Sequence, residues 1–372
     1  MKTTKTLLSV CLMLLGWNLS AQTYDLYISD AGNFDQPPWQ ILRYDQNGEN
    51  PEVFINTNLD WPQDIVFLED QNRVLISNLN SGEIASFNAT SGEYVESFAL
   101  DLNGPTRMKV GADSLLYVLQ WLGNGHVLRF ELDGTPLGAF TSVGLSNSIG
   151  LDWDADGNLY VSSYNLNLIR RYDPNGEDLG VFANTNLNGP TNIWFGENGH
   201  LYALNWGGST VSEFDANGSF VGSFITGGLG QAEGISFLEN GDLLIGNGIN
   251  GSVKRFSSDG TFIEDIIAPG SGGLIRPNAI ILRNRAINGT QEVREDITFA
   301  QPNIGSFFEL DINLVRQWQR IEIYDRAGKL AASLDPHKVS HWDAQQMANG
   351  MYYLYCIPEE GPRILQKIVV QK

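Results

Sequence analysis

The sequence predicts an all-β chain: a six-bladed β-propeller whose first blade is closed by the C-terminal strand of the domain, followed by a small β-sandwich. Three observations predict this fold class. A two-strand pattern recurs every 42 or 43 residues over much of the chain. Each recurrence is followed by a strand that ends in an aromatic residue and by a glycine-containing turn. The 40 glycines and only 2 cysteines favour short strands and tight turns over a disulfide framework.

The repeats define the blades. IGLDWDADGNLYV, which starts at Ile149, contains an alternating strand, a polar turn and an apolar second strand. The same pattern starts at Gln63, Thr106, Thr191 and Glu233. Turns of the Asn-Gly or Asp-Gly type, the strongest short hairpin signal, then separate a third strand from a fourth. The third strands end at Tyr44, Phe87, Phe130, Tyr172, Phe214 and Phe256. Four strands in a period of about 42 residues are typical of a propeller blade.

The ends of the repeat region predict how the ring closes. The first copy starts without its opening strand, at residues 26–30, and a matching strand follows the last full copy at residues 278–282. We expect one blade to be built from both ends of the domain, because this arrangement leaves no exposed sheet edge. The prediction is a six-bladed propeller over residues 22–286.

Residues 1–21 have the features of a secretory signal peptide. Lys2 and Lys5 precede an apolar stretch of about ten residues, and Ala21 provides a small residue at the expected cleavage site. The alternative is a buried first helix. The stretch is too short to span a membrane, which takes about 20 residues, and we expect no transmembrane segment. Removal of residues 1–21 leaves Cys356 as the one cysteine, so no internal disulfide is expected.

The last part of the chain predicts a second domain. We expect a polar linker over residues 287–298 and a small β-sandwich over residues 299–372. Residues 320–325 and 329–334 form a hairpin pattern around Arg326, Ala327 and Gly328. Asn349 and Gly350 open another strand, and residues 364–371 form a last one.

Most of the negative charge belongs to the propeller. The chain has 23 basic and 43 acidic residues, a formal net charge of −20 and a pI near 4.5. Residues 22–285 hold 12 of the basic and 32 of the acidic residues, whereas residues 286–372 hold 9 and 11. This balance argues against nucleic acid as a partner, because phosphate binding needs clustered Lys and Arg. It favours neutral or cationic ligands.

The repeat resembles that of known propellers. Residues 154–161 have the pattern Asp-x-x-Gly-x-Leu-Tyr-Val, which resembles NHL-repeat propellers and is similar to gluconolactonase-like and virginiamycin B lyase-like proteins. The resemblance covers residues 24–288. For gluconolactonase-like proteins it implies a divalent cation on the ligand face, held by Glu, Asp and Asn side chains. For the lyases it implies a proton-transferring histidine, but His126 and His200 are expected on opposite faces.

The C-terminal motifs resemble the type A sorting domain of the type IX secretion system of Bacteroidota. These motifs are Pro302 with Asn303, residues 323–325 with Gly328 and Lys329, residues 349–352, and residues 367–370. Ile304 stands where the family usually has a second proline. The resemblance implies the type IX secretion machinery as a partner and a secreted or outer-cell-surface location. The alternative is an appended β-sandwich that binds a partner of its own.

Candidate site residues lie where the first strand of each blade begins. That position holds Gln63, Thr106, Ile149, Thr191, Glu233 and Asn278, and the next holds Asp64, Arg107, Gly150, Asn192, Gly234 and Ala279. Of these, the ligand-binding candidates are Gln63, Asp64, Arg107, Asn192, Glu233 and Asn278. Glu233 and Asn278 fit the cation site that the resemblance implies, with calcium as the candidate ion. Ile149 and Thr191 replace family ligands, so the site would be weak and we expect no cofactor.

Aromatic residues in the loops of the same face form a second set of candidates. Trp61, Trp121, Tyr164 and Trp206 either stack on sugar rings or apolar ligands, or pack against the adjacent blade. The longest of these loops, residues 31–39, is specific to one blade, and such insertions often carry function.

Two other patterns have a structural interpretation. Residues 152–157 have the acidic spacing of a calcium loop, but Ser163 stands where a bidentate Glu is needed. A recurring hairpin turn explains them better. A polar residue also follows each second strand, and we interpret it as a cap for loop backbone. These residues are Asp30, Asn78, Gln120, Ser163, Asn205 and Asn247.

The sequence therefore predicts an exported, cell-surface binding module without catalytic chemistry, whose extracellular ligand is a glycan, a peptide or a protein. The alternative is a lactone hydrolase or lyase-like enzyme that uses Glu233, Asn278 and Asp64 around a weakly held cation. A third hypothesis is a structural envelope protein without a small ligand.

Overall fold

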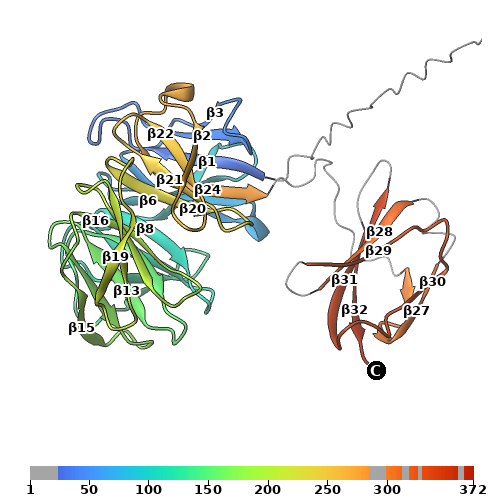
Figure 1. Cartoon of the computed structure of the whole chain (residues 1–372). Coiled ribbons are helices and arrows are strands. Elements are labelled where there is room, and N and C mark those ends of the chain that lie inside the picture. Colours follow the sequence, from blue (N-terminus) through green and yellow to red (C-terminus); the bar gives the residue numbers. More distant parts are fainter. Residues whose placement is uncertain (1–23, 285–298, 312–317, 326–328, 359–363) are drawn as a thin grey trace, which may run out of the picture. The chain divides into compact units, whose positions relative to one another are not determined.

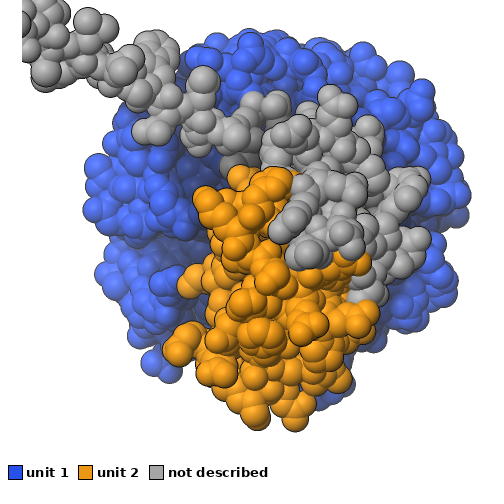
Figure 2. All heavy atoms as spheres, turned by 90° about the vertical axis from the view of Figure 1, so that its right-hand side faces the viewer, with its two compact units in different colours: residues 1–284 blue, residues 285–372 orange. Residues whose placement is uncertain are grey.

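A computed structural model describes residues 24–284, 299–311, 318–325, 329–358 and 364–372. The chain divides into two compact units, Met1–Asn284 and Arg285–Lys372 (Figures 1 and 2). The expected signal peptide, the expected linker and the turn at Arg326–Gly328 lie outside the described residues. In the described part the helical elements are two short 3-10 turns, η1 (Glu69–Gln71) and η2 (Ser271–Gly273). No described helix is long and apolar enough to cross a membrane.

Six four-stranded sheets make up the described part of the first unit, and each corresponds to one sequence repeat. Blade 1 contains β24 (Pro277–Asn284), β1 (Tyr24–Asp30), β2 (Gln40–Asp45) and β3 (Glu52–Ile55). Blade 2 contains β4 (Pro62–Leu68), β5 (Arg73–Asn78), β6 (Glu83–Asn88) and β7 (Tyr94–Ala99). Blade 3 contains β8 (Pro105–Val110), β9 (Leu116–Gln120), β10 (Leu128–Phe130) and β11 (Pro136–Ala139).

The remaining blades follow in chain order. Blade 4 contains β12 (Ser148–Trp153), β13 (Leu159–Ser163), β14 (Leu168–Tyr172) and β15 (Asp178–Ala183). Blade 5 contains β16 (Pro190–Phe195), β17 (Leu201–Asn205), β18 (Thr210–Phe214) and β19 (Phe220–Ile225). Blade 6 contains β20 (Ala232–Phe237), β21 (Leu243–Asn247), β22 (Ser252–Phe256) and β23 (Phe262–Ile267). The predicted propeller is confirmed.

The ring closes as the sequence predicts. β24 pairs antiparallel with β1, so that Leu26 lies opposite Leu282 and Ile28 opposite Ile280. The buried carboxylate of Asp30 accepts the backbone N–H groups of Ile275 and Arg276, at 3.1 and 2.8 Å. Residues from the two ends of the domain are therefore joined by a strand ladder and by side-chain hydrogen bonds.

The core lies between successive blades. The aromatic residues that end the third strands include the largest fully buried side chains of this unit: Tyr44, Phe87, Tyr172, Phe214 and Phe256. Each blade presents an apolar face to its neighbour; Leu75 of β5, for example, packs in one cluster with Met108 of β8 and Val118 of β9. Burial of an aromatic or aliphatic side chain of this size stabilises a fold by about 2–3 kcal/mol.

The acidic loop of blade 4 is a hairpin turn, as interpreted from the sequence. Asp154 Oδ1 accepts the backbone N–H groups of Asp156 and Asn158 at 3.0 and 2.9 Å. Gly157 takes a φ of +82°, a conformation that glycine adopts without steric cost. The Asp154 carboxylate thus fixes the turn by accepting hydrogen bonds from the backbone of the turn residues.

The second unit is a β-sandwich, which confirms the predicted fold. One sheet contains β25 (Ala300–Gln301), β27 (Phe307–Leu310) and β30 (His341–Asp343). The other, in spatial order, contains β26 (Ile304–Gly305), β32 (Ile364–Val370), β31 (Gly350–Pro358), β28 (Trp318–Asp325) and β29 (Leu330–Leu334). Phe308 and Trp342 stack at 5.3 Å in a core that also holds Ile321, Leu354 and Cys356. Burial raises the pKa of the Cys356 thiol, so the sulfur is protonated at neutral pH.

Candidate functional site

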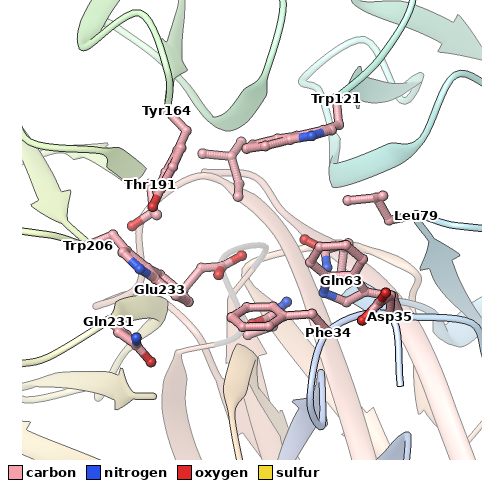
Figure 3. A pocket seen from close by; sticks show the side chains of 13 residues that line it. Phe34, Asp35, Gln63, Leu79, Trp121, Tyr164, Thr191, Trp206, Gln231 and Glu233 are labelled. Atoms are coloured by element: carbon pink, nitrogen blue, oxygen red, sulfur yellow. The ribbon is translucent and has the colours of Figure 1, made fainter. Parts of the chain in front are cut away.

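A pocket of about 500 Å³ lies on the propeller face where the first strands begin. Figure 3 shows side chains from several blades pointing into it, with aromatic rings around its sides and Glu233 and Gln63 deeper inside. Trp61, Trp121, Tyr164 and Trp206, all predicted as candidates, line it together with Gln63, Glu233 and Asn278. Asp64, Arg107 and Asn192 do not line the pocket but lie among the buried or half-buried residues near its floor.

One equivalent backbone position in each blade lies at this face, and in four blades its side chain lines the pocket. It directly follows the second strand, and its N–H donates to the carbonyl of the residue before the first strand of the same blade, as Trp206 does to Gly189 at 3.0 Å. All six blades make this bond, and the residues at this position are Ala31, Leu79, Trp121, Tyr164, Trp206 and Gly248. The fold thus fixes the position of each wall residue, and the sequence decides how large its side chain is.

The aromatic side chains contact one another in series. Ring centroids are 5.7 Å apart between Trp121 and Tyr164, and 6.2 Å between Tyr164 and Trp206. Phe34 continues the series, 6.1 Å from Trp206 and 5.4 Å from Trp61. The half-buried rings thus pack against each other across blades and also line the pocket.

Phe34 was not singled out from the sequence, although its loop was. It lies within residues 31–39, the insertion of blade 1, and it lines the pocket, whereas Ala31 and Gly248, at the wall positions of blades 1 and 6, do not. Arg276 was also missed. Its guanidinium lies 4.0 Å from the Phe34 ring centroid, and its Nη1 donates to Gln231 Oε1. Arg276 is far from Phe34 and Gln231 in the sequence, so no local sequence pattern predicts these contacts.

Three residues that line the pocket have left-handed backbone conformations that side chains other than glycine rarely adopt. The φ angles are +64° for Phe34, +56° for Trp61 and +52° for Gln231. Trp61 precedes the first strand of blade 2, a position that glycine occupies in blades 3 and 5 as Gly104 and Gly189. Asn147 has a φ of +56° at the same position in blade 4, so for Trp61 and Gln231 this conformation belongs to the repeated entry to the first strand.

The floor of the pocket contains buried polar groups without partners. Gln63 and Asn278 are each 2% exposed, and Gln63 Nε2 and Asn278 Oδ1 make no hydrogen bond within the described part of the chain. Trp61 Nε1 is likewise buried and unpaired there. Because an unsatisfied buried polar group costs about 1–3 kcal/mol, these groups are expected to be paired by something that enters the pocket.

Arg107 crosses the axis beneath the floor. Its Nη2 donates to Glu233 Oε1 at 2.7 Å and to the carbonyl of Asn278 at 2.6 Å. Its Nη1 donates to the carbonyl of Gln63, and its Nε to Asn192 Oδ1 at 3.1 Å. One guanidinium from blade 3 is therefore bonded to blades 1, 2, 5 and 6.

Burial dominates the electrostatics of the site. It raises the pKa of Glu233 to about 7, and the nearby Arg107 guanidinium opposes the rise. Burial also raises the pKa of Asp64, whose Oδ2 accepts the Met108 N–H at 2.8 Å. The pKa of Arg276 is lowered by burial, with Glu233 and Asp30 acting in the opposite direction.

The residues at this place do not fit a divalent cation. The Glu233 carboxylate is paired with Arg107, and the same guanidinium also donates hydrogen bonds to the carbonyls of Gln63 and Asn278. A hard cation needs six to eight oxygen ligands. No group of three or more His, Cys, Asp or Glu side chains suited to a metal occurs among the residues that the structure describes. With Arg107 in place, these oxygen atoms are therefore not free to hold a cation.

The repeated polar residues are the last residues of the second strands and not the residues after them, and they act as the predicted structural caps. Asn205 Oδ1 accepts the Asn188 N–H at 2.8 Å, and Asn247 Oδ1 accepts the Gly230 N–H at 2.7 Å. Asp30, Asn78 and Gln120 accept loop N–H groups in the same way, whereas the Ser163 hydroxyl donates to the Ser146 carbonyl. The two histidines of the propeller lie apart from the pocket, His126 Nδ1 beside the Thr141 carbonyl and His200 Nδ1 beside Glu213.

The chain matches no protein-family profile and no curated protein sequence. Among solved structures it is similar to a chain of a nidogen/laminin complex, with 16% identity, a TM-score of 0.57, and coverage of 70% of this chain and 98% of that one. A protein of unknown function from Bacteroides caccae has 14% identity, a TM-score of 0.56 and coverage of 70% and 98%.

A gluconolactonase from Xanthomonas campestris has 18% identity and a TM-score of 0.46, with coverage of 60% of this chain and 83% of that chain. At such identities structural similarity bears on the fold alone. The six four-stranded sheets, one of them closed by strands from both ends of the domain, make residues 24–284 a six-bladed β-propeller.

Proposed function

We propose that the propeller is a binding module whose central pocket takes a neutral, hydroxyl-bearing ring, such as a sugar residue. The observation that carries this proposal is the combination of five aromatic walls with unpaired, buried polar atoms at the floor. Aromatic rings pack on the apolar face of a sugar. A hydroxyl group both donates and accepts, so it can satisfy the amide of either Gln63 or Asn278.

Charge favours a neutral ligand. Glu233 is paired with Arg107, and Arg276 is held by Gln231 and by the Phe34 ring. Neither guanidinium lines the pocket, so neither can donate a pair of hydrogen bonds to an anion bound there. A cation would meet the Arg107 charge beneath the floor. The one other carboxylate in the described lining, Asp35, is exposed.

Binding is tested by titrating the purified protein with a panel of neutral mono- and oligosaccharides and following tryptophan fluorescence, because three tryptophans line the pocket. Trp206→Ala should weaken binding about tenfold, the loss expected for one aromatic stacking contact. Phe237→Ala, which removes a 45% exposed ring outside the pocket, should leave it unchanged. If no neutral sugar binds, the proposal fails.

A second candidate function has one observation in its favour. The carboxyl of Glu233 lines the pocket with a pKa near 7, as a general base requires. Its Oε1 is committed to Arg107, however, and no second carboxyl reaches the floor among the described residues. Hydrolysis of sugar lactones by the wild type, lost in Glu233→Gln without loss of sugar binding, would favour an enzyme over a binding module.

We propose further that the second unit directs export through type IX secretion and that the propeller acts outside the cell. Two of the motifs contact each other, which supports their acting as one folded element: the Val369 N–H donates to the Asn303 carbonyl at 2.8 Å. Gln366, next to the last motif, also donates from Nε2 to Asn303 Oδ1 at 2.9 Å. A reporter carrying residues 1–21 at its start and residues 285–372 at its end should reach the medium or surface of a Bacteroidota host. In a strain lacking type IX secretion it should stay in the periplasm; export there would contradict the proposal.

A further inference from the structure

Arg107 is surrounded by oxygen atoms as a bound cation would be. The Glu233 carboxylate, the Asn192 side-chain amide and the carbonyls of Gln63 and Asn278 all accept from its guanidinium. Carboxylate, amide and carbonyl oxygens are the ligands that a hard divalent cation takes in proteins. The four acceptors come from four different blades and converge on the axis, where Arg107 is 4% exposed.

The sequence leaves room for only one long side chain at this level. The residue that follows the floor position is Arg107 in blade 3, but Gly150, Gly234 and Ala279 in blades 4, 6 and 1. These small residues allow the arginine to extend across the axis to the far blades. The second cation near the site, Arg276, is held by Gln231 and Phe34 and so is not placed to replace it.

Asn192 of blade 5 links Arg107 to the backbone of blade 6. Its Oδ1 accepts from Arg107 Nε, and its Nδ2 donates to the Glu233 carbonyl. The two side chains thus fix the backbone of Glu233 as well as its carboxylate. The orientation of the floor side chains therefore depends on a positive charge at this point.

We infer that Arg107 is a built-in cation of the propeller axis, which holds the pocket floor in place and keeps divalent metal ions out of the oxygen cage beneath it. The guanidinium cancels the Glu233 charge and occupies the space that an ion would need. Binding in the pocket, which this inference takes from the proposed function, is then independent of metal. Removal of Arg107 leaves a cavity lined by the oxygen atoms that accept from its guanidinium.

The experiment measures calcium itself, with the full chain freed of metal by a chelator. Arg107→Ala should take up one calcium ion per chain by calorimetry, and calcium should raise its melting temperature. Arg107→Ala combined with Glu233→Gln should lose at least about tenfold in calcium affinity. The wild type should show no calcium uptake that depends on Glu233. The same is expected of Arg107→Lys, because lysine keeps the positive charge. Addition of chelator should not change the melting temperature of either protein.

Three calcium results would overturn the inference. Calcium uptake by the wild type that Glu233→Gln abolishes would overturn the inference, and so would a folded Arg107→Ala that takes up none. An Arg107→Ala chain that folds neither with calcium nor without it would also overturn it, because calcium should replace the lost charge. Sugar titration of the wild type in chelator tests the proposed function separately. It can fail while the calcium results stand, and the calcium results can fail while sugar still binds.

Discussion

Two buried glutamines of this chain have opposite surroundings. Gln366 of the sandwich accepts the N–H groups of Phe299 and Ala300 at 2.8 Å and donates to the Ala300 carbonyl at 2.6 Å. Gln63 is more deeply buried, yet its Nε2 has no partner in the described residues. A fully paired amide stabilises its fold, whereas an unpaired buried amide can gain its partner from a ligand or an ordered water.

Replacing each glutamine by methionine tests this contrast. Gln366→Met should cost about 3 kcal/mol in the free energy of unfolding, because it leaves two backbone donors and a carbonyl unpaired. Gln63→Met should change the free energy of unfolding by less than about 1 kcal/mol and weaken sugar binding about tenfold. Urea unfolding of both variants and sugar titration of Gln63→Met measure these effects. Equal destabilisation by the two would contradict a binding role for Gln63.

Glu233 makes stability depend on pH in an unusual direction. Its pKa is raised from 4.5 to about 7 by burial, against Arg107 and Arg276 and with a small contribution from Asp64, and Tyr164 also faces it. Between pH 4.5 and 7 the folded chain therefore binds more protons at this group than the unfolded chain does. The free energy of unfolding due to Glu233 should fall as pH rises through that range and level off above it.

The measurement is the difference between the wild type and Glu233→Gln, since other carboxylates, such as Asp173 and Asp178, have lowered pKa values and act in the opposite sense. Urea unfolding at several pH values should show the wild type losing stability relative to Glu233→Gln as pH rises from 4.5 to 7. A difference that is constant with pH would show that the carboxyl does not titrate in this range.

At the scale of elements, the propeller repeats the same local devices and varies the side chains that they carry. The cap at the end of each second strand and the backbone bond of each wall residue occur in all six blades. Only three blades carry an aromatic residue at the wall position, and the loop over residues 31–39 supplies Phe34. Repetition thus marks the residues that hold the fold, and departure from it marks the pocket.

The turn in blade 4 gives a test at this scale. Asp154→Ala should lower the free energy of unfolding by about 1–2 kcal/mol, because its carboxylate accepts from Asp156, Asn158 and Tyr160. Asp156→Ala should have little effect, since that side chain is exposed. Both effects should be the same with calcium and with chelator. In a calcium loop both substitutions would abolish a calcium-dependent stabilisation.

At the scale of the whole molecule, ring closure makes the first unit depend on residues from both of its ends. β24 supplies the innermost strand of blade 1, packs Ile280 into a cluster with Leu26 and Ile28, and provides Asn278 to the pocket floor. The core between blades 6 and 1 is therefore incomplete without it. The stability of the propeller and the floor of its pocket therefore both depend on the pairing of β24 with β1.

Two shortened chains test this dependence. Residues 22–298 retain β24 and should unfold cooperatively, with the sugar affinity of the full chain. Residues 22–276 lack β24, expose the edge of β1, and should show no cooperative thermal transition by circular dichroism. A stable, sugar-binding protein of residues 22–276 would show that closure by β24 is dispensable.

The sequence alone determined the repeat, the blade count and the closing strand, because strand period, turn residues and buried aromatics are local signals that recur at a fixed spacing. It also identified the three tryptophans and the tyrosine of the pocket, since they break the repeat. The caps and the turn at Asp154 were predicted for the same reason.

Only the tertiary structure decided how these residues work together. Arg107 lies 126 positions from Glu233 and 171 from Asn278 in the sequence, and no local pattern predicts that its guanidinium fills the axis in place of an ion. Phe34 and Arg276 likewise meet through ring closure. A propeller brings one residue from each distant blade to a single centre, so the chemistry of that centre depends on contacts that sequence spacing does not encode.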